Sequence, residues 1–214
     1  MIDLDFAVQG LEIAPRSATP LLIFKLRVGA TAPVEHVTIQ AQIRIEATHR
    51  DYAAAERERL SELFGAAADW DRSLRGLLWT NASVTVPAFT DDCVIDLPVG
   101  CSYDFSLAAT KYFYGLKAGE VPLLLLFGGT IFFRNGEGDL QIGQIAQHKE
   151  ASYRFPVGTW RALMERYYSG TVPLSLSREV FDEVYRYKRR HALASWDDTV
   201  RLLLEKGRAE GTRS

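Results

Sequence analysis

The stretch that decides the fold is residues 121–155, which read VPLLLLFGGTIFFR, then NGEG, then DLQIGQIAQHKEASYRF. Its first part, 121–133, carries no charge and includes β-branched and aromatic residues, which indicates a buried strand. The NGEG segment tolerates positive φ, as the connection of a hairpin requires. Gly128 and Gly129 would break a helix but fit a bulge or a close approach of backbones. We therefore predict a long β-hairpin here.

Alternating apolar residues predict more strands. In the return strand of the hairpin the parity of the apolar positions changes at Gly143, which predicts a bulge there. Residues 1–50 contain three strand patterns, the first with a bulge at Gly10. The third has apolar residues at every odd position from Val37 to Ile45 and polar residues between them, which is typical of an antiparallel sheet with one wet face. Two further strands are predicted at residues 82–86 and 93–99.

Helical patterns interrupt and follow the strands. Residues 51–79 read as a helical insertion, with a helix over 52–64, and a short helix is predicted at 108–116. The C-terminal region contains a helix at 156–168, one that Ser177 caps and one that begins with a capping box at Ser195. The apolar stripes of the last two helices are expected to be buried; they are Val180, Phe181, Val184 and Tyr185, and Trp196, Val200, Leu203 and Leu204.

These patterns predict an α+β fold. Its core is an antiparallel, β-sandwich-like sheet structure of about 7–9 strands. Residues 1–155 form this mainly β core with the helical insertion at about 51–79, and residues 156–214 form C-terminal helices that pack on it. A chain of 214 residues with 47% hydrophobic content can bury a substantial core.

The charge balance argues against two classes of partner. The 25 basic and 27 acidic residues give a net charge of -2, which predicts neither nucleic acid binding nor membrane binding. The N-terminus has no basic flank or apolar core of a signal peptide, and the longest uncharged run is shorter than the ~20 residues that cross a bilayer. We expect a cytoplasmic protein.

Cys93 and Cys101 are the only cysteines. A disulfide could close the segment between them, but two small buried thiols are favoured in a reducing compartment. Because no second Cys or His pair lies near them, the usual four-ligand zinc site is not encoded.

One strand face carries candidate catalytic residues. His148, Glu150, Ser152 and Arg154 occupy every second position of the return strand, so a base, an acid and a cation share one face of it. A solvated sheet face produces the same alternation and is the favoured interpretation.

A second candidate site is acidic. Asp91, Asp92 and Asp96 lie close to Asp104 in sequence and could bind calcium or magnesium. The spacing of an EF-hand is absent, and turn chemistry explains the Asp pair at least as well. The chain has no P-loop, dinucleotide fingerprint, nucleophile elbow or HExxH motif, so no cofactor is predicted.

Aromatic and basic residues supply candidates for partner binding. The run from Tyr185 to Arg190 is basic, but on a helix its arginines lie near acidic residues, so a charged solvent face is favoured over a nucleic-acid site. Tyrosine and arginine are common at protein interfaces. The candidate docking residues are Tyr112, Tyr114, Tyr185, Tyr187, Arg186 and Arg190.

Several segments resemble a family of uncharacterised bacterial proteins that share a domain of unknown function. They are QIRIE at 42–46, LLWT at 77–80, DLPV at 96–99, CSYD at 101–104, AA at 108–109 with KY at 111–112, GEVPL at 119–123, GTIF at 129–132 and KEASY at 149–153. The resemblance covers most of residues 1–160. It implies an accessory, assembly or subunit role, because members are associated with gene clusters for nickel-iron hydrogenases. It transfers no catalytic residue, and the chain has no His-rich tract or Cys-x-x-Cys pair for metal delivery.

The leading hypothesis is a non-enzymatic protein-binding accessory, assembly or subunit protein that could serve a nickel-iron hydrogenase complex, with hydrogenase subunits as its partners. The alternative is a small-ligand or metal-binding enzyme that uses His148 and Glu150 or the 91–104 region. Nucleic-acid binding ranks last. The sequence leaves open the identity of the partner, catalytic activity and the oligomeric state, including a homo-oligomer.

Overall fold

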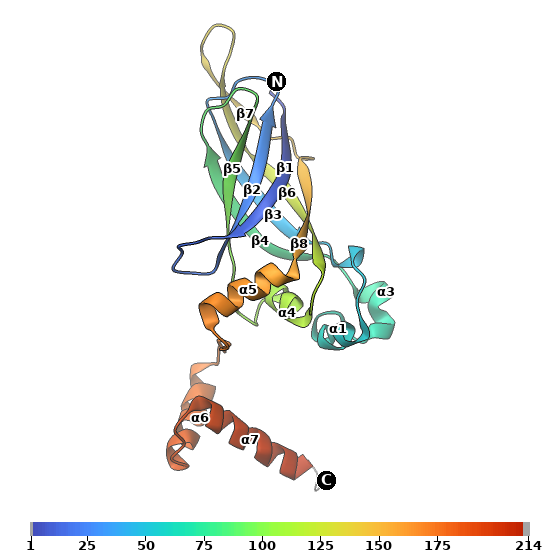
Figure 1. Ribbon diagram of the computed structural model, residues 1–214, viewed down its shortest axis with the longest axis vertical. Coiled ribbons are helices and arrows are strands. Elements are labelled where there is room, and N and C mark those ends of the chain that lie inside the picture. The colour runs from blue at the N-terminus through green and yellow to red at the C-terminus, as the bar shows by residue number, and fades with distance from the viewer. Residues whose placement is uncertain (1, 212–214) are drawn as a thin grey trace. The chain divides into compact units, whose positions relative to one another are not determined.

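The computed structural model describes residues 2–211 and places the strands in two antiparallel sheets (Figure 1). One sheet has the order β1-β2-β5, and the other has the order β4-β3-β6-β7, with β8 also paired to β6. The strands are β1 (Leu4–Ile13), β2 (Leu21–Ala30), β3 (His36–Ile45), β4 (Leu77–Val86), β5 (Asp92–Gly100), β6 (Glu120–Arg134), β7 (Leu140–Gln144) and β8 (Glu150–Pro156). The predicted α+β fold with an antiparallel, sandwich-like core is confirmed.

The core forms because the apolar faces of the two sheets meet. The odd positions of β3 from Val37 to Ile45 are buried, as their alternation predicts. Phe6 of β1 stacks on Phe127 of β6 with ring centroids 4.2 Å apart, and Phe24 of β2 meets Tyr153 of β8 edge to face at 5.7 Å. These contacts join strands from both sheets into one apolar core.

Two glycines have the roles that the sequence predicts. The register of β1 against β2 shifts between Val8 and Gly10, which is the predicted bulge. Gly129 lies opposite Ile39 with φ of 140°, and a Cβ there would overlap the carbonyl oxygen of Thr38. Gly129 thus permits a close approach of two backbones that no other residue allows.

The return strand of the hairpin differs from the prediction. Instead of one strand with a bulge at Gly143, the chain forms β7 and β8, which pair with opposite ends of β6. Ile145 N donates to Gly129 O (3.0 Å) and Phe127 N donates to Lys149 O (2.8 Å), so the chain leaves the ladder between these two bonds. The parity change is therefore made by a turn over residues 146–149, which a hydrogen bond from Lys149 N to Ala146 O (3.2 Å) closes.

The insertion also differs. The helix predicted over 52–64 is broken into α1 (Ala54–Arg59) and α2 (Ser61–Phe64), and α3 (Trp70–Ser73) follows. Leu77 to Trp79, which the sequence places in the insertion, belong to β4, because Leu77 pairs with Ile45 of β3. Trp79 then packs on Phe113 and Phe155. Pairing with a strand that is distant in sequence thus determines the extended conformation of this segment.

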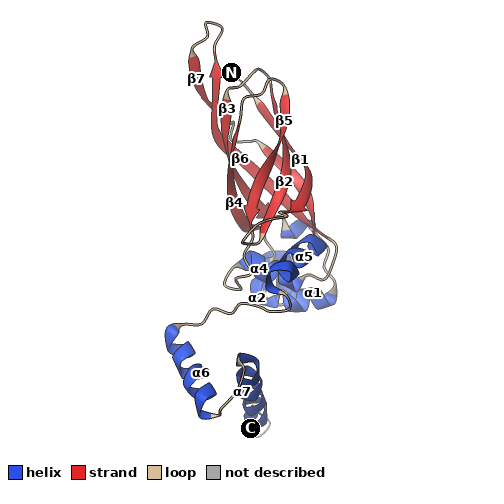
Figure 2. Ribbon diagram, turned by 60° about the vertical axis from the view of Figure 1, so that its left-hand side comes forward, coloured by secondary structure: helices blue, strands red, loops and turns tan. Residues whose placement is uncertain are grey.

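The chain divides into two compact units, Met1–Val172 and Pro173–Ser214. The first contains both sheets, α1 to α3, α4 (Ala108–Gly115) and α5 (Val157–Tyr168), and its helices gather at one end of the sheets (Figure 2). Trp160, Leu163 and Met164 of α5 are buried. Among residues 2–211 no helix combines the length and apolarity that crossing a membrane requires.

The second unit consists of α6 (Arg178–Arg190) and α7 (Trp196–Gly211). Both predicted caps are present. Val180 N donates to Ser177 Oγ (3.3 Å) at the start of α6. At the start of α7, Asp198 N donates to Ser195 Oγ (3.0 Å) and Ser195 N donates to Asp198 Oδ2 (3.3 Å), which makes the expected reciprocal capping box.

Candidate functional site

The acidic candidate residues lie on or near the outer face of the first sheet, where two of them are paired with cations. Arg27 Nε is 3.2 Å from Asp92 Oδ2, and Lys25 Nζ is 2.7 Å from Asp96 Oδ1. The carbonyl of Asp91 accepts a hydrogen bond from Ala30 N (2.8 Å) beside β2. Within residues 2–211 no group of three or more His, Cys, Asp or Glu side chains is placed to hold a metal ion. The arrangement is a ladder of cross-strand ion pairs.

His148 and Glu150 are both exposed and lie in different settings. His148 is in the turn before β8, whereas Glu150 is the first residue of that strand. Glu150 and Arg154 help to line a hollow of about 680 Å³ on the outer face of the second sheet, and His148 is not among the lining residues. The structure therefore does not bring the two candidate catalytic groups to one pocket.

Cys93 and Cys101 are free thiols. They lie near the start and just beyond the end of β5, which is an extended strand. Eight residues of extended chain separate their Cα atoms by about 26 Å, far beyond the reach of a disulfide. Burial raises the pKa of the Cys101 thiol to about 12. The two cysteines are free, as expected, but both residues are half-buried rather than buried.

Tyr112, a candidate docking residue, is fully buried. The Tyr52 hydroxyl donates to Ala47 O (2.7 Å), so its oxygen accepts the hydrogen bond from the Tyr112 hydroxyl (2.6 Å). Burial raises the pKa of Tyr112 far above its usual value. In the folded chain this side chain belongs to the core.

A buried ion pair lies next to this tyrosine pair. Arg50 Nη1 and Nη2 donate to the two carboxylate oxygens of Glu56 at 3.1 and 3.2 Å, and the two side chains are only 10% and 8% exposed. Glu56 also accepts from Lys117 N (3.0 Å) and Ala53 N (3.3 Å). Burial would raise the pKa of Glu56, but Arg50 and the two backbone donors outweigh it, so the pKa is lowered. The pair fastens α1 to the segment after α4.

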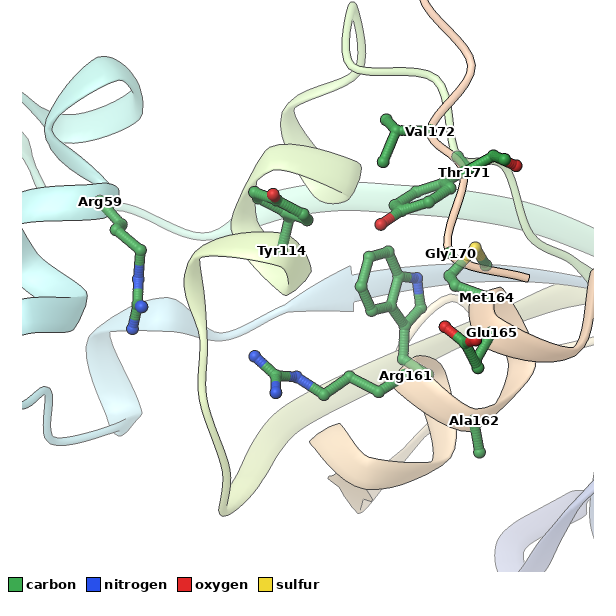
Figure 3. A pocket seen from close by; sticks show the side chains of 11 residues that line it. Arg59, Tyr114, Arg161, Ala162, Met164, Glu165, Gly170, Thr171 and Val172 are labelled. Carbon is green, nitrogen blue, oxygen red and sulfur yellow. The ribbon is translucent and has the colours of Figure 1, made fainter. Parts of the chain in front are cut away.

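One concave feature of the first unit is a pocket at its helical end (Figure 3). We call it the aromatic pocket. It has a volume of about 610 Å³. Its lining residues come from α1, the segment after β5, α4, α5 and the segment after α5: Arg59, Tyr103, Tyr114, Trp160, Arg161, Ala162, Met164, Glu165, Gly170, Thr171 and Val172. The sequence singled out only Tyr114 among them.

Two arginines of the aromatic pocket are held by the C-terminal end of α4. Arg59 Nε donates to Gly115 O (2.8 Å), and Arg161 Nη2 donates to Leu116 O (2.7 Å). These are the carbonyls that a helix leaves without an internal partner. In the described part of the chain neither guanidinium forms an ion pair with a carboxylate. Each therefore retains unused N–H donors.

Aromatic rings form the rest of the wall. Tyr103 meets Trp160 edge to face with ring centroids 5.4 Å apart, and it also contacts Tyr168 at 5.1 Å. Burial raises the pKa of Tyr103, with smaller contributions from Tyr114 and Glu165. Its phenol is thus a neutral hydrogen-bonding group at physiological pH. Tyr114 is 51% exposed.

The remaining candidate docking residues lie in the second unit. Tyr185, Arg186 and Arg190 are exposed, and Tyr187 is half-buried beneath Lys206, whose Nζ is 5.1 Å from the ring centroid. Tyr185 stacks on Phe181 with centroids 6.0 Å apart. The apolar stripes of α6 and α7, expected to be buried, are largely exposed, as at Phe181 and Trp196 (each 43%). Across residues 173–209, Thr199 is the one buried side chain.

Comparison with known proteins gives a family but no activity. No curated protein matches the chain. Two solved structures of β-glucosidase from Kluyveromyces marxianus, one labelled with selenomethionine and one in complex with glucose, align with TM-scores of 0.28 and 0.27 and identities of 9% and 10%. The alignments cover 72% and 71% of this chain but 15% and 14% of the enzyme chains, and similarity this low supports no argument about fold or function. The model of the family of unknown function DUF6084 matches residues 1–212, so the chain belongs to this family.

Proposed function

We propose that the protein is a non-enzymatic binding module that docks onto a larger protein complex, or helps to assemble it, through the apolar face of its C-terminal helices. We call this the helical docking face, defined by Val180, Phe181, Tyr185, Trp196, Val200, Leu203 and Leu204. The observation that carries the proposal is the exposure of this face. Each of these side chains is between 37% and 56% exposed.

The physical argument is that such a face requires a cover. An amphipathic helix normally packs its apolar stripe against another element. The helices α6 and α7 contact each other, but this contact leaves every apolar residue among 173–209 at least partly exposed. Phe181, Tyr185 and Trp196 form one aromatic cluster, with Phe181 and Trp196 centroids 5.3 Å apart. Large exposed apolar patches of this kind mark interaction sites, and aromatic anchors supply most of their binding energy.

The nickel-iron hydrogenase complex is the first partner to test. Its support is the resemblance of the sequence to proteins associated with hydrogenase gene clusters, which is associational. The enzyme alternative has less support, because His148 and Glu150 do not share a pocket and Asp92 and Asp96 are paired with Arg27 and Lys25.

The test is purification of the tagged full-length chain from its native host in three forms. The wild type is compared with Phe181→Ser/Trp196→Ser, which removes two anchors, and with Asp182→Ser/Glu183→Ser, which changes the polar side of α6. We expect one partner in stoichiometric amount with the wild type and the polar control, and its loss with the anchor variant.

Three outcomes separate the possible covers. Loss of a hetero-partner only with the anchor variant supports the proposal. A dimer that dissociates only in that variant would assign the face to a second copy. Equal recovery of the partner by all three forms, with a lower melting temperature for the anchor variant, would refute the proposal and favour the predicted packing of the C-terminal helices on the β core.

A further inference from the structure

We propose that the aromatic pocket binds a small molecule that combines a planar aromatic ring with an anionic group, such as an aromatic carboxylate or phosphate. This inference goes beyond the proposed docking function and concerns the other unit of the chain. Pocket size, ring surfaces and charge each contribute to it. A volume of about 610 Å³ lies within the range of small-molecule sites.

The ring surfaces select a planar group. Tyr103 and Trp160 are nearly perpendicular, at 77°, and are fixed by packing on Tyr168 and Phe113. Tyr114, by contrast, contacts Phe105 and Tyr103, with ring centroids 4.9 and 6.4 Å away, and is still 51% exposed. A ligand ring can stack on the exposed part of Tyr114 without moving the packed rings.

The charges select an anion. Arg59 and Arg161 are anchored to the carbonyls of adjacent residues, Gly115 and Leu116, so the two guanidiniums are held near one another. Figure 3 shows the Arg161 side chain extending toward the side of the pocket where Arg59 lies. The hydrogen bonds that cap α4 use one N–H of each arginine. Among the described residues the two positive charges still have no carboxylate partner. An anion between them would accept charge-assisted hydrogen bonds from both.

The remaining polar groups set the orientation. In Figure 3, Glu165 lies on the opposite side of the pocket from Arg59. Its charge raises the pKa of Tyr103, which places the two groups within electrostatic reach. Glu165 would repel the anionic end of a ligand. The anion therefore binds on the arginine side, and the ring lies toward Tyr114 and Tyr103.

The experiment follows the four tryptophan indole N–H signals of the full-length chain by NMR during ligand titration. Replacing each tryptophan with Phe assigns the signals. The probes are indole-3-acetate and phenyl phosphate, with the neutral analogues tryptophol and phenol and the ring-free anion acetate. We expect saturable shifts of the Trp160 signal with both aromatic anions, and binding of the neutral analogues and of acetate to be at least about tenfold weaker.

Variants show which residues bind the ligand. We expect Tyr114→Ala and Arg161→Met each to weaken binding by about tenfold, whereas Arg154→Met, which changes an arginine of β8 outside the pocket, leaves the affinity unchanged. Because Arg161 also caps α4, the exposed Tyr114 provides the test that does not depend on folding. Equal affinity for neutral and anionic probes, unchanged affinity in both pocket variants, or no shift of the Trp160 signal at millimolar concentrations would each overturn the proposal.

Discussion

Replacing Glu56 with Gln should strongly destabilise the first unit, because the substitution leaves a buried cation without its counter-ion. The carboxylate accepts four hydrogen bonds, two from Arg50 and two from backbone N–H groups. Glutamine keeps the shape but faces Arg50 with an amide that is itself partly a donor. Breaking a buried ion pair by removing one partner costs about 3–5 kcal/mol. For a unit of this size that corresponds to a fall in melting temperature of roughly 6–20 °C.

The matched control is Glu62→Gln. Glu62 also pairs with a cation, Lys111, but its side chain is 67% exposed. Solvent screens this pair, so the change in the free energy of unfolding should be below about 1 kcal/mol. Urea unfolding at pH 7, followed by tryptophan fluorescence, measures both values. A cost below about 1 kcal/mol for Glu56→Gln would refute the argument that the pair holds the insertion in place.

The pH dependence gives a second measurement on the same residue. The pKa of Glu56 is lower in the folded chain than in the unfolded chain, because Arg50 and the backbone donors outweigh burial. Its contribution to stability is therefore complete above the unfolded pKa of about 4.3 and is lost as pH falls through the folded pKa. The difference in unfolding free energy between wild type and Glu56→Gln should shrink in acid. A difference that stays constant from pH 7 to acid would contradict the lowered pKa.

Three further predictions concern the packing of the first unit. Gly129→Ala should lower the free energy of unfolding in urea by at least about 2 kcal/mol, because the added Cβ overlaps the neighbouring backbone and φ is positive. Gly128→Ala should lower it by less than about 1 kcal/mol, because a Cβ at that position extends into open space. Tyr52→Phe should lower the free energy of unfolding by about 1–3 kcal/mol and Tyr112→Phe by only about 1 kcal/mol, because only the first leaves a buried hydroxyl donor, that of Tyr112, without an acceptor. Equal values would contradict the assignment of Tyr112 as the donor to Tyr52. Alkylation by iodoacetamide at pH 8, followed by intact mass, should leave Cys101 unmodified until urea is added, because its thiol is buried with a pKa of about 12; rapid double modification would contradict this.

The sequence predicts the sheet elements best where one face is dry and the other wet. Alternation alone locates β3, since each of its odd positions is buried and the strand pairs on both sides. It fails for the start of β4, where Leu77 and Leu78 are adjacent apolar residues and only pairing with β3 makes them a strand. Alternation also fails to predict the turn between β7 and β8, because a bulge within one strand and a turn between two strands produce the same change of parity.

The aromatic pocket could not be predicted from the spacing of residues in the sequence, because its lining residues come from separate segments of the chain. Arg59, Tyr103 and Arg161 converge only when α1, the segment after β5 and α5 meet around the end of α4. The two tyrosines of α4 show the same limit on a smaller scale. Tyr112 and Tyr114 are two positions apart, so about 200° of helix separates them, and one is buried while the other is open. Tertiary packing decides which is which.

The C-terminal helices show how an apolar face that is left uncovered within its own unit bears on function. The amphipathic pattern of α6 and α7 is read correctly, and both helices and their caps form where the sequence places them. Within their own unit the two helices leave the apolar stripe uncovered, and periodicity establishes that such a face requires a cover without telling what provides it. Where a chain is locally consistent at every other level, a departure from the sequence pattern is expected at a functional or a strained site. The exposed stripe of Phe181 and Trp196 therefore argues for docking more strongly than the tyrosine content that first suggested it.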